Sequence, residues 1–442
     1  MAISPFDSAL YRDLFSDREI AALFTDSAEV RAMMIVEGAL AKVQGEAGVI
    51  PEISALFIHR CSLELAIDPG GLAAETGRSA VPVPALVAAF RKAMEAPEHA
   101  QFVHWGATSQ DIMDTALALR LRQVIALYEA RLAAVIQGLG ALAHLHADLP
   151  MAGRTYGQVA TPTSFGAVVA SWGAPLIRHL ERLEALKPRL LNVSLSGAAG
   201  TLSAIENGPE IRAALAGALG LGDPGASWHS ERDCIGEFAA WMAGLATTLA
   251  KMGEDLTLMS QSGIGEITLG ASGGSSTMPQ KANPVMPSVL VALGRQAQAL
   301  AGAIMGAGIH RQQRDGAAWF VEWLNLPQIC AATGRALEIA AELSTSIAPN
   351  EAAMALGIDP DDLGLIYAEA LSFALAKKMR RPDAQAAVKE LCVQARASGQ
   401  PLADLAQKRF GDHDLEGLFT PANQLGEAPQ TARAFAKRAK AL

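Results

Sequence analysis

Residues 233–260, DCIGEFAAWMAGLATTLAKMGEDLTLMS, decide the fold class. Apolar side chains recur here at alternating spacings of three and four residues, at Ile235, Phe238, Met242, Leu245, Leu249, Met252, Leu256 and Met259. This spacing forms an a/d seam, which is typical of a helix that packs along other helices at a shallow angle. Because the seam has no break, we predict one long helix in a helical bundle.

The same periodicity extends to both sides of this stretch. A second seam lies in residues 125–142, in a helix that we expect to start near Asp111, which can cap it. A third helical run covers residues 163–186. Asn283-Pro284 is a helix start signal, with Asn at the cap and Pro at the first helical position. Since alternating β patterns are nearly absent, the chain is predicted to be all-α.

Three regions follow from this pattern. We expect an N-terminal helical domain over residues 1–109, a central bundle of long helices over residues 110–349, and a smaller C-terminal helical domain over residues 350–442. Long helices with apolar seams on more than one face are costly to leave exposed. Self-association is therefore predicted.

Composition excludes several classes of protein. Of the 442 residues, 50% are hydrophobic and 18% are charged, which excludes disorder as the main state. The net charge of −9 argues against a nucleic-acid partner, which needs a basic face. The first ten residues carry no basic cluster and no long apolar run, so no signal peptide is predicted. We expect a cytoplasmic protein that does not bind membranes.

Metal and disulfide chemistry are not indicated either. The four cysteines lie far apart, and neither a CxxC nor an HExxH pattern occurs. The prediction is therefore a chain without a catalytic metal and without a cofactor.

Four polar stretches interrupt the helical pattern, and each lies next to a predicted long helix. They cover residues 104–111, 153–158, 263–284 and 310–323. Loops at the ends of rigid helices are a common place for functional sites. Simpler interpretations exist for each: Thr108 and Ser109 can cap a helix, His104 can be structural, Arg154-Thr155 can form a turn, and Arg314 can be a solvated charge.

The third stretch has the most specific chemistry. The N-terminus of the helix after Pro284 offers free backbone N–H groups and a positive dipole end, which suit a carboxylate or an enolate-like anion. Lys281 adds a full positive charge, and Ser275 supplies a hydroxyl in that field. A linker capped by Asn283 is the alternative without chemistry.

Residues 274–284, GSSTMPQKANP, resemble the GSSxMPxKxNP motif of the fumarase/aspartase superfamily. A His-x-x-x-Thr-Ser-x-Asp stretch and a Gly-Arg-Thr stretch precede it in the order that the family has, and Ser196–Thr201 resembles the family's glycine-rich turn. The resemblance covers nearly the whole chain. It implies an all-α homotetramer with a central twenty-helix bundle, active sites each built from three subunits, and cleavage or formation of a C–O or C–N bond β to a carboxylate without a metal.

The same resemblance implies roles for individual residues. Ser275 would transfer the proton at carbon, and Lys281 would assist it and, with Asn283, bind a substrate carboxylate. The residues that the resemblance places around the substrate are His104, Thr108, Ser109, Arg154, Thr155, Gln158, Ser276, Asn283 and Arg314.

One departure from the family pattern bears on the substrate. Members that expel an amine usually carry a histidine directly after Gly-Arg-Thr, as their general acid; here that position is Tyr156, and the next expected histidine is Val159. A general acid matters most when the leaving group is basic. A carboxylate, with a pKa of about 4, leaves without protonation. The alternative is that His104 or Tyr156 itself replaces the missing acid.

Loss of the histidine therefore favours the lactonizing (cycloisomerase) branch, which residues 37–41 and 319–327 also resemble. The hypothesis is that a small tricarboxylate, 3-carboxy-cis,cis-muconate, closes to 4-carboxymuconolactone, a step of protocatechuate breakdown in the β-ketoadipate pathway. Two alternatives stay open: a C–N lyase similar to adenylosuccinate lyase, and a non-catalytic helical oligomer similar to the lens crystallins of this superfamily.

Overall fold

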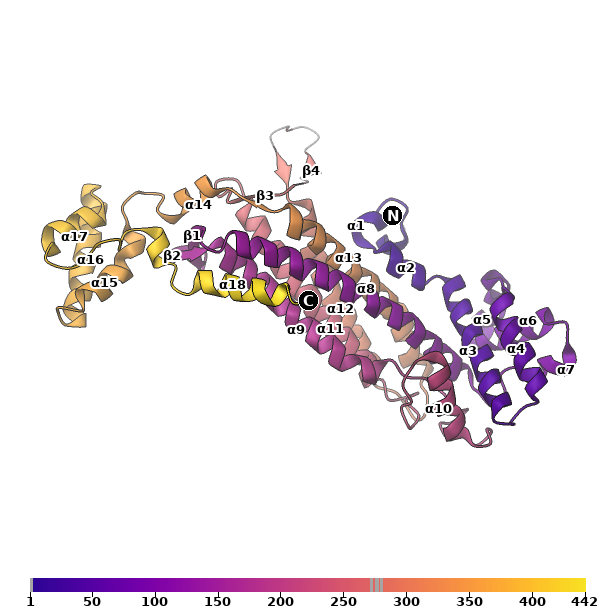
Figure 1. Cartoon of the computed structure of the whole chain (residues 1–442). Helices are drawn as coiled ribbons and strands as arrows, with labels where there is room; N and C mark the ends of the chain where they lie inside the picture. Colours follow the sequence, from indigo (N-terminus) through magenta and orange to yellow (C-terminus); the bar gives the residue numbers. More distant parts are fainter. Residues whose placement is uncertain (1–2, 271–272, 275–277, 279–280) are drawn as a thin grey trace. The chain divides into compact units, whose positions relative to one another are not determined.

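The computed structural model describes residues 3–270, 273–274, 278 and 281–442. Helices dominate it, as predicted (Figure 1). The longest are α3 (Asp26–Glu46), α8 (Ser109–Leu145), α9 (Phe165–Leu190), α11 (Asp233–Met259), α12 (Val285–Ala307) and α13 (Gly316–Ser346). The others, with 3-10 helices written η, are η1 (Pro5–Asp7), α1 (Arg12–Phe15), α2 (Arg18–Leu23), α4 (Glu52–Glu64), η2 (Pro69–Leu72), α5 (Ala73–Ser79), α6 (Val83–Ala93), α7 (Pro97–Ala100), α10 (Gly208–Leu219), α14 (Glu351–Ile358), η3 (Leu365–Tyr367), α15 (Ala368–Leu375), α16 (Arg381–Ser398), α17 (Leu402–Phe410), η4 (Pro421–Gln424) and α18 (Ala428–Ala439).

The strands are short and form antiparallel pairs. They are β1 (Pro150–Thr155) with β2 (Gln158–Ser164), β3 (Ile267–Thr268) with β6 (Ala348–Pro349), and β4 (Gly273–Gly274) with β5 (Ala282–Asn283). The β1–β2 hairpin turns at Tyr156 and Gly157, which both have positive φ, +51° and +73°. Positive φ at both central residues is what a two-residue hairpin turn needs.

The chain forms two compact units. Unit 1 consists of Met1–Arg131, His179–Thr247 and Ala292–Glu338, and unit 2 of Leu132–Arg178, Thr248–Val291 and Ile339–Leu442. The predicted central region contributes to both units. The division into three domains stays a prediction.

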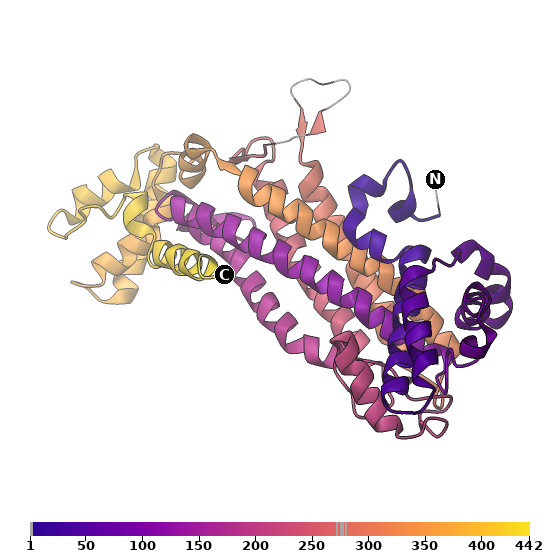
Figure 2. The ribbon, with the colours of Figure 1, turned by 45° about the vertical axis from the view of Figure 1, so that its right-hand side comes forward.

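Unit 1 has its core around the long helices and the N-terminal helices. α3 packs along α4, and the two lie side by side in both ribbon views (Figures 1 and 2). Their close approach requires Gly38, because a Cβ there would lie 1.8 Å from Ser62 Oγ. Tyr128 of α8 packs against Phe238 of α11 and donates a hydrogen bond of 2.8 Å to the Cys330 carbonyl of α13.

Unit 2 holds the C-terminal helices. Leu371, Leu375, Val388, Leu391 and Leu402 form the apolar core of α15, α16 and α17. α18 packs on α9, where a Cβ at Gly173 would lie 2.0 Å from Phe435. Trp172 of α9 donates a hydrogen bond of 2.6 Å to Asp255 of α11.

The predicted seam of α11 is confirmed. All eight of its apolar residues, from Ile235 to Met259, are buried. Apolar periodicity therefore predicted both the helix and the face that packs.

Two predicted helix starts lie within one or two residues of the observed starts, but the residues predicted to cap these helices are wrong. α8 begins at Ser109, so Asp111 lies in its first turn and is not the cap. The Asp111 carboxylate accepts a hydrogen bond from the backbone N–H of Thr108, the residue before the helix. α12 begins at Val285, and the Pro284 carbonyl accepts from Ser288 N. Asn283 pairs with Gly273 in the β4–β5 ladder and is not the cap.

By length and composition alone, α8 and α12 are apolar enough to cross a membrane. In each helix, 44% of the most apolar window is buried inside the protein. α8 also carries the buried polar residues Gln110, Asp111, Asp114 and Arg120. These are features of core helices, which pass the same test.

Candidate active site

Asp111 joins the start of α8 to the glycine-rich turn at residues 196–201. Its Oδ1 accepts from Ser196 N and from His229 Nε2, both at 2.8 Å. Its Oδ2 accepts from Gly197 N and Thr108 N, both at 3.0 Å. Gly197 has a φ of +72°, which explains a glycine at this point. The buried carboxylate thereby fixes the loop that precedes α8.

Arg314 is held by two residues of this cluster. Its Nε donates to Gln110 Oε1 at 2.7 Å, and its Nη2 lies 3.5 Å from His229 Nδ1. Because a carboxylate only accepts, His229 Nε2–H donates to Asp111, and its Nδ1 faces the guanidinium. Arg314 Nη1 donates no hydrogen bond to any of the described residues, which leaves that edge available to an anion.

A buried ion-pair network lies behind Gln110. Arg232 donates to both Asp114 oxygens at 2.8 and 3.1 Å and to both Glu322 oxygens at 2.8 and 2.6 Å. The three side chains are only 1–2% exposed. Gln110 Nε2 donates to Asp114 Oδ2 and to the His229 carbonyl, so its Oε1 is the atom left to receive Arg314. The network thereby orients Arg314.

This network carries one more carboxylate than guanidinium. The pKa of Glu322 is raised, mainly because the side chain is buried. The hydrogen bonds and charge of Arg232 lower this pKa, and the negative charge of Asp114 raises it. Asp114 and Glu322 raise the pKa of Arg232 despite its burial, so the guanidinium stays charged.

The predicted residues of unit 1 lie in or beside this cluster. Thr108 donates its N–H to Asp111, Ser109 is the first residue of α8, and Arg314 is linked through Gln110 and His229. His104 lies in the loop just before them, where its Nδ1 is 2.7 Å from Glu37 Oε1.

The predicted residues Arg154, Thr155 and Gln158 lie on the β1–β2 hairpin of unit 2. Both Nη atoms of Arg154 donate to the buried Glu266, at 3.0 and 2.8 Å. Thr155 pairs with Gln158 at the end of the ladder, beside the fully exposed Tyr156. Arg154 is thus a fixed cation whose charge is already neutralised within the chain.

The predicted catalytic loop is described only in part. Ser275 and Ser276 lie outside the described residues. Lys281 is exposed, its backbone N–H donates to the Met278 carbonyl at 3.0 Å, and Asn283 is in β5.

Sequence reasoning missed the residues that orient this site, above all Glu37, His229, Arg232, Glu266 and Glu322. For Glu322 the sequence does contain a signal, because it is the one charged residue in the apolar stretch 317–327. A charge in such a context is buried only with a partner.

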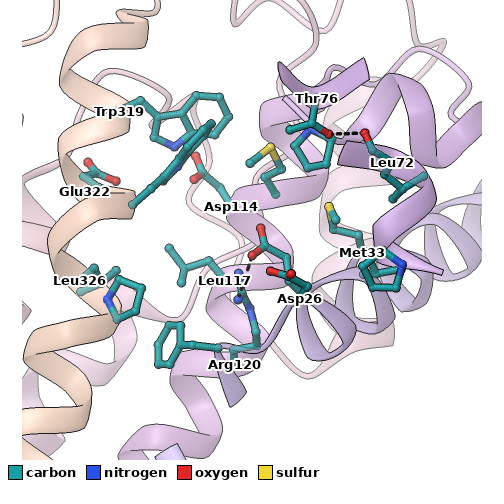
Figure 3. Close-up of a pocket in the computed structure, with 18 of the residues that line it drawn as sticks. Asp26, Met33, Leu72, Thr76, Asp114, Leu117, Arg120, Trp319, Glu322 and Leu326 are labelled. Atoms are coloured by element: carbon teal, nitrogen blue, oxygen red, sulfur yellow. Dashed lines mark hydrogen bonds and ion pairs between the residues drawn. The ribbon is translucent and has the colours of Figure 1, made fainter. Parts of the chain in front are cut away.

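A cavity of about 450 Å³ lies in unit 1 between α3, α8 and α13 (Figure 3). Trp319, Leu117, Leu326 and Met33 give it apolar walls, as the close-up shows. Its charged lining consists of Asp26, Glu29, Asp114, Glu322 and Arg120. Because Arg232 pairs with Asp114 and Glu322, two guanidinium groups oppose these four carboxylates, and the remaining negative charge disfavours a tricarboxylate here.

One cluster of described carboxylates is close enough to hold a cation, namely Asp17, Glu19 and Glu338. Arg131 forms ion pairs with all three. The guanidinium accounts for this acidic cluster, so we assign no metal to it.

Comparison with known proteins gives the family. Residues 9–299 match a family model described as lyase, and residues 364–435 match one described as adenylosuccinate lyase C-terminus. A protein of Pseudomonas aeruginosa named 3-carboxy-cis,cis-muconate cycloisomerase is 37% identical, with 98% of this chain and 96% of that protein covered. The chain belongs to the lyase family of the fumarase/aspartase superfamily.

Further relatives of this lyase support the assignment. A protein of the same name from Acinetobacter baylyi is 35% identical over 98% of this chain and 99% of its own length. The crystal structure of the 3-carboxy-cis,cis-muconate lactonizing enzyme from Pseudomonas putida matches with a TM-score of 0.91 at 32% identity, covering 98% of this chain and 99% of that one. The predicted fold class and superfamily are therefore confirmed, and the chain is an enzyme of a family whose members are typically oligomeric.

Proposed function

We propose that this enzyme is a cycloisomerase that lactonizes 3-carboxy-cis,cis-muconate to 4-carboxymuconolactone. The observation that carries the proposal is the similarity, over 98% of the chain, to relatives that bear that name. The residues of the site supply a chemical reason that is independent of the names.

That reason is the absence of a general acid at the expected position. Tyr156 stands where C–N lyases carry histidine, and its side chain is fully exposed at the tip of the hairpin. In lactonization a carboxylate adds to a double bond, and in the reverse direction a carboxylate leaves. A group with a pKa of about 4 needs no proton to leave, so this reaction tolerates the loss.

The forward step forms one C–O bond and one C–H bond and breaks one C=C π bond. A substrate carboxylate oxygen forms the new C–O bond, and the π electrons move onto the carbon beside a second carboxylate. Lys281, and the Nη1 edge of Arg314, stabilise the resulting enolate-like charge. Ser275 gives its proton to that carbon and recovers one from solvent. Because the attack is intramolecular, orientation by Thr108, Ser109, Thr155, Gln158, Ser276 and Asn283 contributes much of the rate.

The assembly is part of the proposal. We infer a cytoplasmic homotetramer with a twenty-helix core, in which three subunits contribute to each active site. In support, the chain belongs to a lyase family whose members are typically oligomeric.

The test is turnover of purified protein with 3-carboxy-cis,cis-muconate, followed by ultraviolet absorbance. Ser275→Ala should lower kcat by at least about 100-fold, the usual size of a lost proton-transfer group, while the assembly stays intact. Ser262→Ala, a change at an exposed serine outside the motif, is the matched control and should leave kcat unchanged. Near-normal turnover by Ser275→Ala removes that serine from the role.

The two alternatives predict different results in the same assay. A C–N lyase would cleave adenylosuccinate and leave the muconate untouched. A crystallin-like oligomer would assemble and turn over neither substrate. The comparisons favour neither alternative.

A further inference from the structure

Helix α3 holds the loop before α8 at two points. Glu37 Oε1 lies 2.7 Å from His104 Nδ1, and Gln44 Nε2 donates a hydrogen bond of 2.8 Å to the Trp105 carbonyl. Glu37 and Gln44 are seven residues apart, about two helical turns, so they lie on one face of α3. Both are fully buried. The loop is therefore fixed by one charged and one neutral side chain.

These contacts determine which ring atom His104 presents. His104 has a φ of +65°, a left-handed conformation that is unfavourable for a residue other than glycine. Such a conformation persists only where the surroundings enforce it. With Nδ1 bonded to Glu37, the ring has Nε2 left for a ligand. No described residue hydrogen-bonds to that atom, and a fifth of the side chain, 20%, is exposed.

Three charged groups face the ring from three helices. Burial by itself lowers the pKa of His104, but the charge and hydrogen bond of Glu37 on α3, together with Asp111 on α8, outweigh burial and the opposing charge of Arg91 on α6. The pKa of His104 is therefore raised. Glu37 Oε2 is buried without a hydrogen-bond partner, so among the described residues the imidazole is the partner of this carboxylate.

A charge count within the proposed function gives this imidazole a role. The substrate has three carboxylates. Lys281 and Arg314 supply two cations for them, whereas Arg154 is already neutralised by Glu266. These residues therefore leave one of the three substrate carboxylates without a cation.

We propose that His104 binds the remaining substrate carboxylate through Nε2–H as an imidazolium, and that Glu37 is the positioning residue that keeps the ring charged and oriented. This inference rests on the proposed function, because the bound anion is one of the three carboxylates of that substrate. Glu37 acts only through His104 and does not touch the substrate.

The first measurement needs no turnover. Diethyl pyrocarbonate acylates neutral imidazole, so the rate of His104 modification against pH, followed by mass spectrometry of its peptide, reports the titration of that ring. The wild-type midpoint should lie above the usual histidine value of about 6.5. Glu37→Gln keeps a hydrogen-bond acceptor but removes the charge, so the midpoint should fall and modification at pH 6.5 should be several-fold faster. Gln44→Met, the matched control, breaks the neutral contact and should leave the midpoint unchanged.

The second measurement links the ring to the substrate. KM for carboxymuconate should rise with pH through the midpoint found for each variant. At pH 7.5, Glu37→Gln should therefore raise KM by about tenfold, as expected for one lost charge-assisted hydrogen bond, with a smaller change in kcat. His104→Asn should raise KM and remove this pH dependence.

Equal modification midpoints in wild type and Glu37→Gln would overturn the inference, and so would a KM profile that does not follow the midpoint. A wild-type protein that leaves carboxymuconate unchanged overturns the proposed function and the substrate assignment. In that case the midpoints still decide whether Glu37 keeps His104 charged.

Discussion

Replacing Arg232 by methionine should destabilise the protein strongly, and more at neutral pH than at pH 5. Arg232 donates four hydrogen bonds to Asp114 and Glu322, and the three side chains are almost fully buried. Removing one partner of a buried ion pair costs about 3–5 kcal/mol, because the remaining charge is uncompensated. Here two carboxylates lose their cation, and among the described residues the Gln110 amide is the hydrogen-bond donor that Asp114 keeps. We therefore expect a loss near the upper end, about 4–5 kcal/mol.

The pH dependence separates this charge effect from a packing effect. Burial already raises the pKa of Glu322 in the wild type, and Arg232 is the group that acts against this. In Arg232→Met the pKa of Glu322 rises further above its value in the unfolded chain. A carboxylate with a raised pKa in the folded state costs stability once the pH exceeds its unfolded pKa, so the penalty is full at pH 7.5 and smaller at pH 5.

Urea unfolding, followed by far-ultraviolet circular dichroism, measures the loss. With an m value of about 3 kcal/mol/M, the midpoint should fall by about 1–2 M at pH 7.5. Arg122→Met on the exposed side of α8 is the control and should cost less than about 1 kcal/mol. The triple variant Asp114→Leu/Arg232→Met/Glu322→Leu should regain most of the loss, since no buried charge remains. An equal loss at both pH values, or no recovery in the triple variant, would refute the reasoning.

Two further predictions follow from single positions. Gly38→Ala places a Cβ 1.8 Å from Ser62 Oγ at the α3–α4 contact, so the free energy of unfolding measured in urea should fall by about 1–3 kcal/mol. Gly77→Ala is the control, because nothing lies within 4 Å of a Cβ there. It should leave the free energy of unfolding unchanged or raise it by up to about 1 kcal/mol. A Gly38→Ala protein as stable as the Gly77→Ala protein contradicts the close contact. Tyr156→His restores the family histidine and should change the kcat of lactonization by less than about threefold, because a carboxylate leaves without a general acid. A rise in kcat of tenfold or more would show instead that lactonization needs a general acid at this position.

Much of the fold was predictable because it is encoded locally. The a/d spacing from Ile235 to Met259 needs only neighbouring residues to be recognised, and all eight positions are buried as predicted. The exact helix starts were less predictable. Asp111 accepts hydrogen bonds from Ser196, Gly197 and His229, which lie 85 to 118 residues further along the chain. These tertiary contacts decide its role, and spacing around Asp111 does not contain them.

The residues of the candidate site likewise include some that local sequence identifies and others that only tertiary contacts bring together. The motifs that contain Thr108, Arg154 and Lys281 are continuous in the sequence, so the resemblance identified them. The groups that orient the site are not continuous: Arg232 meets Glu322 across 90 residues, and His104 meets Glu37 across 67. Pairing across such separations is set by how the helices pack, which local patterns do not specify.

Lactonization in D₂O distinguishes the proposed reaction from C–N cleavage in one experiment. Purified protein is mixed with 3-carboxy-cis,cis-muconate, and the product is examined by proton NMR. We expect 4-carboxymuconolactone that carries one solvent deuterium on the carbon beside the lactone, with adenylosuccinate left uncleaved in a parallel reaction. Unchanged muconate together with cleavage of adenylosuccinate would contradict it.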